Sequence, residues 1–219
     1  MAEINEPMWV ASADPDERAV THLHQLLCRY DAPRFAISGG SAASIVGPLR
    51  RALGIHWTKL RLTWADERRV AFGHEDSNRG AAYRAEVLEE AVPPSLELPL
   101  YEDGETREQA ETRVTQALQD DFGGGLDVVL LGMGGDGHVA SLFVGADWRD
   151  EPVYGIDDSP KPPPERMTLS RPFLATASHT VLFAKGEAKR DALLRLREGD
   201  PSLPATGLPG LVVFSDQVV

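Results

Sequence analysis

The sequence predicts an α/β protein with a mainly parallel β-sheet and helices on both of its faces. Segments with the apolar pattern of strands alternate along the chain with segments that have the pattern of amphipathic helices. One of them, DVVLL at 127–131, is apolar throughout, as is typical of a strand that is covered on both faces. The chain has 219 residues, which is enough for one substantial core, so we expect one domain over residues 1–219.

The first part of the chain begins with an expected helix at 14–30, for which Asp14 is a candidate N-cap. The apolar stripe of this helix consists of Ala19, Val20, Leu23, Leu26, Leu27 and Tyr30. A short strand at 34–37 runs into the sequence SGGSAA. A second amphipathic helix follows, with an apolar side made of Ile45, Val46, Leu49 and Leu53. A strand at 59–64 then ends at the sequence ADERRV.

The rest of the chain continues the alternation. Further helices are expected at 78–90, 106–122 and 187–197. Besides 127–131, further strands are expected at 180–184 and 211–214. The proline-rich stretch at 160–164 is too short to link two domains, and we expect it to be a stiff connection within one domain.

Composition excludes several classes of partner. A formal net charge of −12 argues against nucleic acid and against anionic membranes. No apolar run approaches the length of a transmembrane helix, and residues 1–10 lack the pattern of a signal peptide. The single Cys28 cannot form an internal disulfide, which suits a reducing compartment, so we expect a cytoplasmic protein. No His/Cys cluster has the spacing of metal ligands, so we expect no metal and no other cofactor.

Three unusual segments, SGGSAA, WADERRV and GMGGDGHVASLF, each begin where an expected strand ends. Ligands of parallel sheets bind at the carboxyl ends of the strands. We therefore expect the three segments to converge in space and to form the ligand site. Because the whole chain is acidic, an anionic ligand would need local positive charge there.

In the first segment, Gly39 and Gly40 lack the Cβ atoms that would keep a ligand from the backbone, and Ser41 is a candidate cap of the following helix. The N–H groups at the start of that helix can bind an anion, and the hydroxyls of Ser38 and Ser41 can add donors. A plain strand-to-helix turn is an equal alternative. The segment also resembles a loosened G-x-S-x-G nucleophile elbow with Ser41 as the nucleophile, but only one expected strand precedes it, whereas several do in that fold.

The third segment matches G-x-G-x-x-G over residues 132–137, and Asp157 stands about where a ribose-binding acid would. We interpret this match as misleading, because Asp136 would put negative charge beside a pyrophosphate and residues 138–152 make a poor helix. The alternative is that Asp136 and His138 are themselves catalytic residues. A histidine can take a proton from water near neutral pH, a nearby carboxylate can fix its tautomer, and glycine-rich backbone offers N–H groups to an oxyanion.

The second segment carries a run of charges, Asp66, Glu67, Arg68 and Arg69, after the strand that ends at Trp64. Such a run is usually a solvated turn with local ion pairs. The functional alternative puts Asp66 and Arg68 into the shared cleft, where one orients the base or the substrate and the other neutralises developing charge. Composition does not choose between the two.

Taken together, SGGSAA, WADERRV with Ser77-Asn78, LLGMGGDGHVASLF, PKPPPERMTLS and GEAKRDALL resemble the 6-phosphogluconolactonase family, within the wider group that includes glucosamine-6-phosphate deaminases. They occur in the family's order over about residues 36–207. The resemblance implies a modified Rossmann-like fold, a monomer, and hydrolysis of 6-phosphoglucono-δ-lactone to 6-phosphogluconate in the oxidative pentose phosphate pathway. Ala42 and Val144 stand where the family usually has proline, and we expect adjusted loop geometry with activity retained.

The resemblance also implies roles for residues of the site. His138 is similar to the base that activates water, with Asp66 and Asp136 positioning it or the substrate. Arg68 is implied to face the lactone carbonyl or the phosphate. The implied phosphate site consists of Gly39, Gly40, Ser41, Arg166 and Lys189.

Two alternatives remain beside the lactonase. The nearer one is a deaminase of glucosamine 6-phosphate, but the glycine-rich loop of deaminases typically continues toward Asn-Glu-Pro, where this chain has Ser141-Leu142-Phe143. The other is a non-catalytic sugar-phosphate sensor, which would keep the phosphate residues and would not need His138.

Overall fold

A seven-stranded parallel sheet forms the centre of the computed structural model, which describes residues 7–219. Residues 1–6, part of the segment that we expect to carry no signal peptide, lie outside the described residues. The strand order is β1-β10-β9-β6-β2-β3-β5, and every neighbouring pair is parallel. The strands are β1 (Met8–Ala11), β2 (Arg34–Ile37), β3 (Arg61–Trp64), β5 (Leu96–Leu98), β6 (Val128–Gly132), β9 (His179–Ala184) and β10 (Leu211–Ser215). The mainly parallel sheet predicted from the sequence is confirmed.

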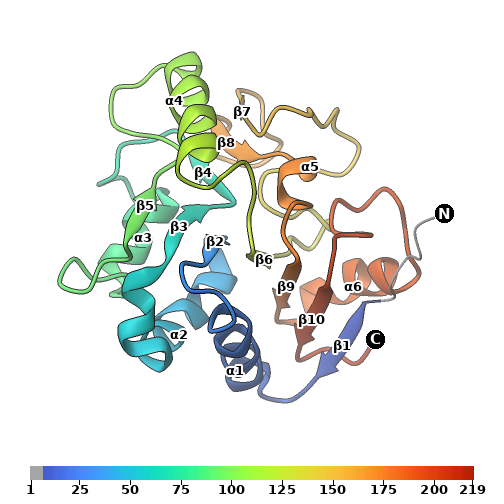
Figure 1. Cartoon of the computed structure of the whole chain (residues 1–219). Helices are drawn as coiled ribbons and strands as arrows, with labels where there is room; N and C mark the ends of the chain where they lie inside the picture. The colour runs from blue at the N-terminus through green and yellow to red at the C-terminus, as the bar shows by residue number, and fades with distance from the viewer. Residues whose placement is uncertain (1–6) are drawn as a thin grey trace.

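Helices cover both faces of this sheet. Figure 1 shows α1 and α2 on one side of it and α4 and α5 on the other. The α-helices are α1 (Pro15–Leu27), α2 (Val46–Leu53), α3 (Asn78–Arg84), α4 (Arg107–Asp120), α5 (Arg171–Leu174) and α6 (Arg190–Arg197), and the 3₁₀ helices are η1 (Gly40–Ile45), η2 (Gly54–Lys59) and η3 (Glu187–Lys189). Asp14 occupies the N-cap position of α1, but its side chain makes no capping hydrogen bond. The expected N-cap position is therefore confirmed, and only the capping hydrogen bond of the side chain is missing.

A second, three-stranded sheet lies beside the main one. Its order is β4-β8-β7, with β4 at Asp66–Arg68, β8 at Arg166–Leu169 and β7 at Val153–Ile156, and both of its pairs are antiparallel. The sequence patterns did not predict this sheet. Its strand β4 holds the charged run, so the solvated turn considered for residues 66–69 is wrong for Asp66 to Arg68.

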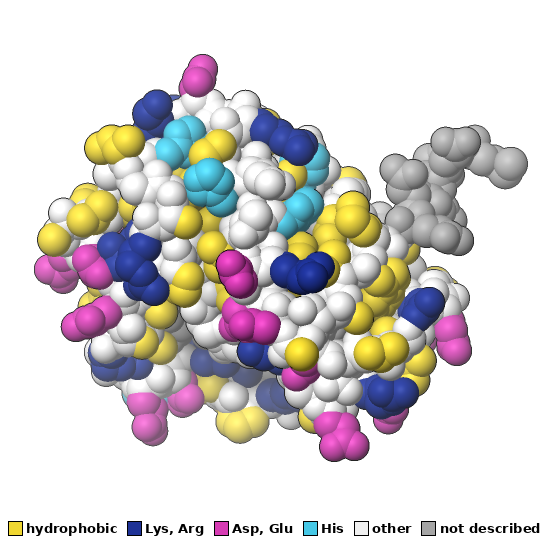
Figure 2. Space-filling view, turned by 90° about the horizontal axis from the view of Figure 1, so that it is seen from below, with side chains coloured by type: hydrophobic (Ala, Val, Ile, Leu, Met, Phe, Trp, Pro, Cys, Tyr) yellow, Lys and Arg dark blue, Asp and Glu magenta, His cyan; other side chains and the backbone are white. Residues whose placement is uncertain are grey.

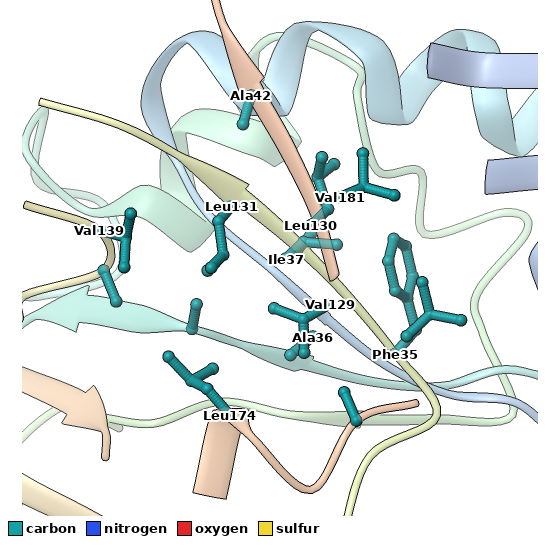
Figure 3. Close-up of a cluster of buried hydrophobic side chains, with 14 of the residues drawn as sticks. Phe35, Ala36, Ile37, Ala42, Val129, Leu130, Leu131, Val139, Leu174 and Val181 are labelled. Carbon is teal, nitrogen blue, oxygen red and sulfur yellow. The ribbon is translucent and has the colours of Figure 1, made fainter. Parts of the chain in front are cut away.

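The core anchors both glycine-rich segments. Figure 3 shows side chains of β2 and β6 within one cluster of buried residues, in agreement with the pairing of these two strands. Ala42, from the segment after β2, and Val139, from the segment after β6, belong to the same cluster and are fully buried. Because close-packed interiors leave little freedom, these two side chains fix their segments at the carboxyl ends of the strands.

The surface carries charges of both signs. Figure 2 looks at the molecule from below the view of Figure 1 and shows Lys and Arg side chains interspersed with Asp and Glu over this face. Among the helices of residues 7–219, none combines the length and the apolar character needed to cross a bilayer.

Candidate active site

A cavity of about 330 Å³ lies where three segments of the main sheet meet the small sheet. Residues 38–41 follow β2, residues 132–138 follow β6, and Lys189 ends the turn η3 that follows β9. The cavity is lined by Ser38, Gly39, Gly40, Ser41, Asp66, Arg68, Asn78, Gly132, Met133, Gly134, Gly135, His138, Ala140, Lys161, Pro162, Arg166 and Lys189. The segments singled out in the sequence therefore converge, as the topology of parallel sheets predicts.

Eight of the nine predicted site residues line this cavity; the exception, Asp136, contacts it through its bond to His138. Of the histidines within residues 7–219, only His138 is among the lining residues. In the same part of the chain, no group of three or more His, Cys, Asp or Glu side chains is placed to hold a metal ion. The structure thus brings the predicted residues together, and the role of each one stays a prediction.

His138 and Asp136 form a hydrogen-bonded pair. Nδ1 of His138 lies 2.6 Å from Oδ1 of Asp136. An ionised carboxylate can only accept, so Nδ1 carries the proton and Nε2 is the basic nitrogen. The imidazole is 17% exposed and packs at a tilt against Phe143, with 4.9 Å between the ring centroids. Burial lowers the pKa of His138 below its usual 6.5, although Asp136 opposes this, so the ring is neutral at pH 7.

Gly134 makes room for this pair. A Cβ atom at residue 134 would lie 2.1 Å from Nδ1 of His138 and 2.4 Å from Oδ1 of Asp136. The N–H of Gly134 donates to the carbonyl of His138 over 2.8 Å, and its carbonyl accepts from the N–H of Gly137 over 2.9 Å. Gly137 has a φ of +95°, which side chains other than hydrogen disfavour. The glycines of this segment therefore serve the geometry of the Asp136–His138 pair.

The sequence analysis missed one cation of the site, Lys161. Its Nζ lies 3.0 Å from Oδ2 of Asp136, and its side chain is 42% exposed in the cavity. Burial alone would raise the pKa of Asp136, but the hydrogen bonds with Lys161 and His138 lower it to about 2. A signal was present in the sequence: Lys161 is the one charged residue of PKPPP, where prolines restrict the backbone.

The small sheet brings three more charged side chains to the cavity. In the antiparallel register, Arg68 lies opposite Arg166 and Asp66 lies opposite Thr168. Residues two apart on a strand point to the same face, so Asp66 and Arg68 share the face that lines the cavity. Asp66 is buried, and its Oδ2 accepts a hydrogen bond of 2.7 Å from Oγ of Ser141 and lies 3.8 Å from Nη1 of Arg166. Of the two interpretations of the charged run, the structure favours the cleft for Asp66 and Arg68.

Most hydrogen-bond donors of Arg166 are used inside the protein. Nε donates to the carbonyl of Pro163 over 3.1 Å, and Nη2 donates to those of Lys161 and Pro162 over 3.2 and 3.1 Å. Nη1 lies 3.4 Å from Oγ of Ser141. Burial lowers the pKa of Arg166 from its usual value. The guanidinium therefore holds residues 161–163, and Nη1 alone keeps a donor to spare for a ligand.

Two polar side chains of the cavity offer unused donors. Nη1 of Arg68 donates to the carbonyl of Asp76 over 2.6 Å, but its Nε is buried and has no partner among residues 7–219. Oγ of Ser38 is likewise buried without a partner in the described chain. Buried polar atoms are nearly always hydrogen-bonded in folded proteins, so both atoms are suited to a polar ligand.

Glu67 fixes the wall behind the cavity. Its buried carboxylate accepts hydrogen bonds of 2.7, 2.7 and 2.8 Å from the backbone N–H groups of Arg68, Asn78 and Arg79. Burial raises the pKa of Glu67, and these donors oppose the rise. Nδ2 of Asn78 donates to the carbonyl of Asp66 over 3.0 Å. Strand β4 and the start of α3 are thus tied together on one side of the site.

The segment after β2 approaches this wall closely. A Cβ atom at Gly39 would lie 2.1 Å from Oδ1 of Asn78, and Gly40 has a φ of +62°. Ser41 does not cap the next helix as expected, because residues 40–45 form η1 with Gly39 as N-cap, and α2 begins only at Val46. Within residues 7–219, no hydrogen bond joins Oγ of Ser41 to a base, so the structure gives no support to a serine nucleophile.

The G-x-G-x-x-G match does not form a dinucleotide site. In the described chain, residues 133–152 contain no helix, whereas the nucleotide fold needs one directly after the loop. Asp157, the candidate ribose-binding acid, forms ion pairs with Arg69 and Arg107 and is not among the residues that line the cavity.

Comparison with known proteins agrees with this site. A family model described as glucosamine-6-phosphate isomerases/6-phosphogluconolactonase matches residues 11–213. The chain belongs to this family. A relative from Rattus norvegicus named 6-phosphogluconolactonase is 36% identical over 190 residues, which cover 78% of this chain and 72% of the relative. A relative of the same name from Homo sapiens is 36% identical over 197 residues, with 82% and 74% covered.

Solved structures share the fold of this family member. A 6-phosphogluconolactonase from Shewanella baltica superposes with a TM-score of 0.81 at 22% identity, covering 97% of this chain and 99% of that one. A monomeric glucosamine-6-phosphate deaminase superposes with a TM-score of 0.78 at 16% identity, covering 96% of each chain. At these identities, the likeness confirms the α/β fold alone, which the lactonase and the deaminase structures share.

Proposed function

We propose that this protein hydrolyses 6-phosphoglucono-1,5-lactone to 6-phosphogluconate, as a carboxylic ester hydrolase of the oxidative pentose phosphate pathway. The rat and human relatives named 6-phosphogluconolactonase, each 36% identical to this chain, support the assignment. The observation that carries it is the Asp136–His138 pair beside a cavity that Arg68, Arg166 and Lys189 also line. An ester with an anionic tail needs a base at its carbonyl and cations around its charge, and this cavity offers both.

His138 acts as the general base. Nε2 takes a proton from a water molecule while the water oxygen bonds to C1 of the lactone. The tetrahedral oxyanion then collapses, the bond between C1 and the ring oxygen breaks, and the imidazolium returns the proton to the ring oxygen. The product is the open-chain acid with a new hydroxyl at C5, and the protein forms no covalent intermediate.

Asp136, Asp66 and Arg68 support this step. Asp136 accepts from Nδ1, which keeps Nε2 basic and stabilises the imidazolium as it forms. Arg68 lines the cavity and stabilises the oxyanion with the charge of its guanidinium, whose Nε has no partner among the described residues. Asp66 contacts Ser141 and Arg166 and so positions the guanidinium that faces the substrate.

The phosphate group binds beside glycine backbone and cationic side chains. Gly39 and Gly40 let its oxygen atoms approach the backbone N–H groups, and Ser41 adds a hydroxyl. Lys189 supplies a point charge, and Arg166 contributes its charge together with the remaining donor of Nη1. These local cations answer the objection that a chain with a net charge of −12 repels an anionic substrate.

A deaminase of glucosamine 6-phosphate is the second candidate, because a monomeric enzyme of that kind has the same fold. Release of ammonia from glucosamine 6-phosphate would identify it. A sugar-phosphate sensor would instead bind 6-phosphogluconate without turning over either compound.

The deciding experiment is hydrolysis of freshly generated 6-phosphogluconolactone, followed by acid release, with the spontaneous rate subtracted. Unphosphorylated gluconolactone is the matched control. We expect rapid turnover of the phosphorylated lactone and a much lower kcat/KM for the control, because the control lacks the anion that the cations bind. Folded protein that adds nothing to the spontaneous rate would exclude the lactonase.

We further propose that the protein works as a one-domain monomer in the cytoplasm. One hydrophobic cluster connects the elements of residues 7–219, which supports a single domain over this part of the chain. Cys28 is a free thiol, which suits a reducing compartment. Sedimentation of the purified protein would test the monomer.

A further inference from the structure

Lys161 has no role in the reaction described so far, although it lines the cavity. It lies in the connection between β7 and β8, where its backbone is held on both sides. Its N–H donates to Oγ of Ser159 over 3.3 Å, and its carbonyl accepts from the same Oγ over 3.0 Å and from Nη2 of Arg166 over 3.2 Å. With the backbone fixed, the side chain reaches the loop after β6.

The ammonium group of Lys161 contacts both members of the Asp136–His138 pair. Nζ lies 3.0 Å from Oδ2 of Asp136 and 3.4 Å from Nδ1 of His138. The other carboxylate oxygen, Oδ1, lies 2.6 Å from Nδ1. The two oxygens of Asp136 are thus divided between a cation and the imidazole, and a carboxylate held at both oxygens cannot rotate away from its partner.

We propose that Lys161 is a positioning residue, which locks the Asp136 carboxylate toward His138 and disfavours positive charge on the imidazole before substrate binds. The proposal rests on the lactone hydrolysis proposed above. It assigns Lys161 to the base and not to the phosphate, which Lys189 serves from η3.

The charges around His138 explain why such a residue is needed. Asp136 and Asp66 both favour the imidazolium, whereas Lys161 and the burial against Phe143 oppose it. A carboxylate alone beside the ring would raise the pKa of His138 and leave part of the base protonated at neutral pH. An ammonium group that shares the carboxylate offsets this effect while the orienting hydrogen bond remains.

The test is an NMR titration of His138 in the substrate-free protein, with its resonances assigned by comparison with His138→Ala. In Lys161→Gln, the pKa of His138 should rise by about one pH unit, the effect that the dielectric constant of water gives for removing a cation 3.4 Å from Nδ1. Lys161→Arg should restore most of the wild-type value. Lys59→Gln removes an equal charge from an exposed site and should change nothing. An unchanged pKa in Lys161→Gln would overturn the proposal.

Lactonase kinetics give the second readout. We expect the kcat/KM of Lys161→Gln relative to wild type to be lower at pH 6 than at pH 8, by less than tenfold, because a rise of one pH unit reaches its tenfold limit only well below both pKa values. A rise in KM of equal size at every pH would show a substrate contact instead and would contradict the positioning role. Because the titration needs no substrate, it decides the role of Lys161 even if the protein lacks lactonase activity, so the two proposals fail separately.

Discussion

Replacing Gly134 by alanine tests whether the Asp136–His138 pair performs the chemistry. The new Cβ atom would lie 2.1 Å from Nδ1 and 2.2 Å from Cε1 of His138, whereas ordinary van der Waals contact begins at 3.4 Å. The imidazole would therefore have to move by about 1.3 Å. Oδ1 of Asp136 would lie 2.4 Å from the same atom, so both partners are pushed away.

The expected loss follows from this displacement. A misplacement of about 1 Å at a reacting group costs roughly 100-fold in rate, which corresponds to about 2.7 kcal/mol of transition-state stabilisation. The assay is kcat/KM on freshly generated 6-phosphogluconolactone for Gly134→Ala, with thermal unfolding as the check on the fold. Gly73→Ala is the matched control, because a Cβ atom there meets nothing within 4 Å. A Gly134→Ala protein with wild-type kcat/KM would refute the assignment of the base.

Three further outcomes are expected. His138→Ala should lower kcat roughly 10²- to 10⁴-fold. The Kd of this variant for 6-phosphogluconate, measured by calorimetry, should stay close to wild type. A loss of binding as large as the loss of turnover would contradict the base role. Lys189→Ala should raise KM about tenfold with little change in kcat, because Lys189 contacts the phosphate in the ground state and in the transition state alike. A lower kcat with an unchanged KM would contradict the assignment of Lys189 to the phosphate site. The kcat/KM of the wild type should decline at low pH with a midpoint below 6.5, because burial lowers the pKa of His138 and the neutral ring is the base, while Asp136, with a pKa of about 2, stays ionised. A midpoint above 6.5 would be inconsistent with this.

Local patterns were enough to predict five of the seven strands of the main sheet, all except β1 and β5, and the meeting of its loops. The apolar run of β6 and the glycines after it are signals that lie within a dozen residues of one another. The topology of parallel strands then places the loops that follow the strands at the same edge of the sheet. Patterns failed where the structure depends on distant partners. Strand β4 has three charged residues in a row and pairs with β8 about 100 residues later. Its buried Glu67 is stabilised by the N–H groups of Asn78 and Arg79, contacts that the charged run itself does not reveal.

Other differences have similar causes. The edge strand β1 is only partly buried, so it lacks a clear alternation. The helix expected at 78–90 ends at Arg84, since the N–H groups of Val87 and Leu88 both turn back to the carbonyl of Ala82 and Glu86 adopts a φ of +54°. Hydrogen bonds with Ser159 and Arg166 hold the backbone of Lys161 at the site, and such contacts leave no periodic pattern in the sequence.

The register of the small sheet places Arg68 directly opposite Arg166. Two like charges at such a position repel and weaken the pairing of their strands, and this repulsion contributes to the lowered pKa of Arg166. A substrate that brings a developing oxyanion to Arg68 and a phosphate to Arg166 offsets this repulsion. Selection for thermal stability of the ligand-free protein would therefore tend to replace one of these two arginines, whereas selection in the presence of the ligand would keep both.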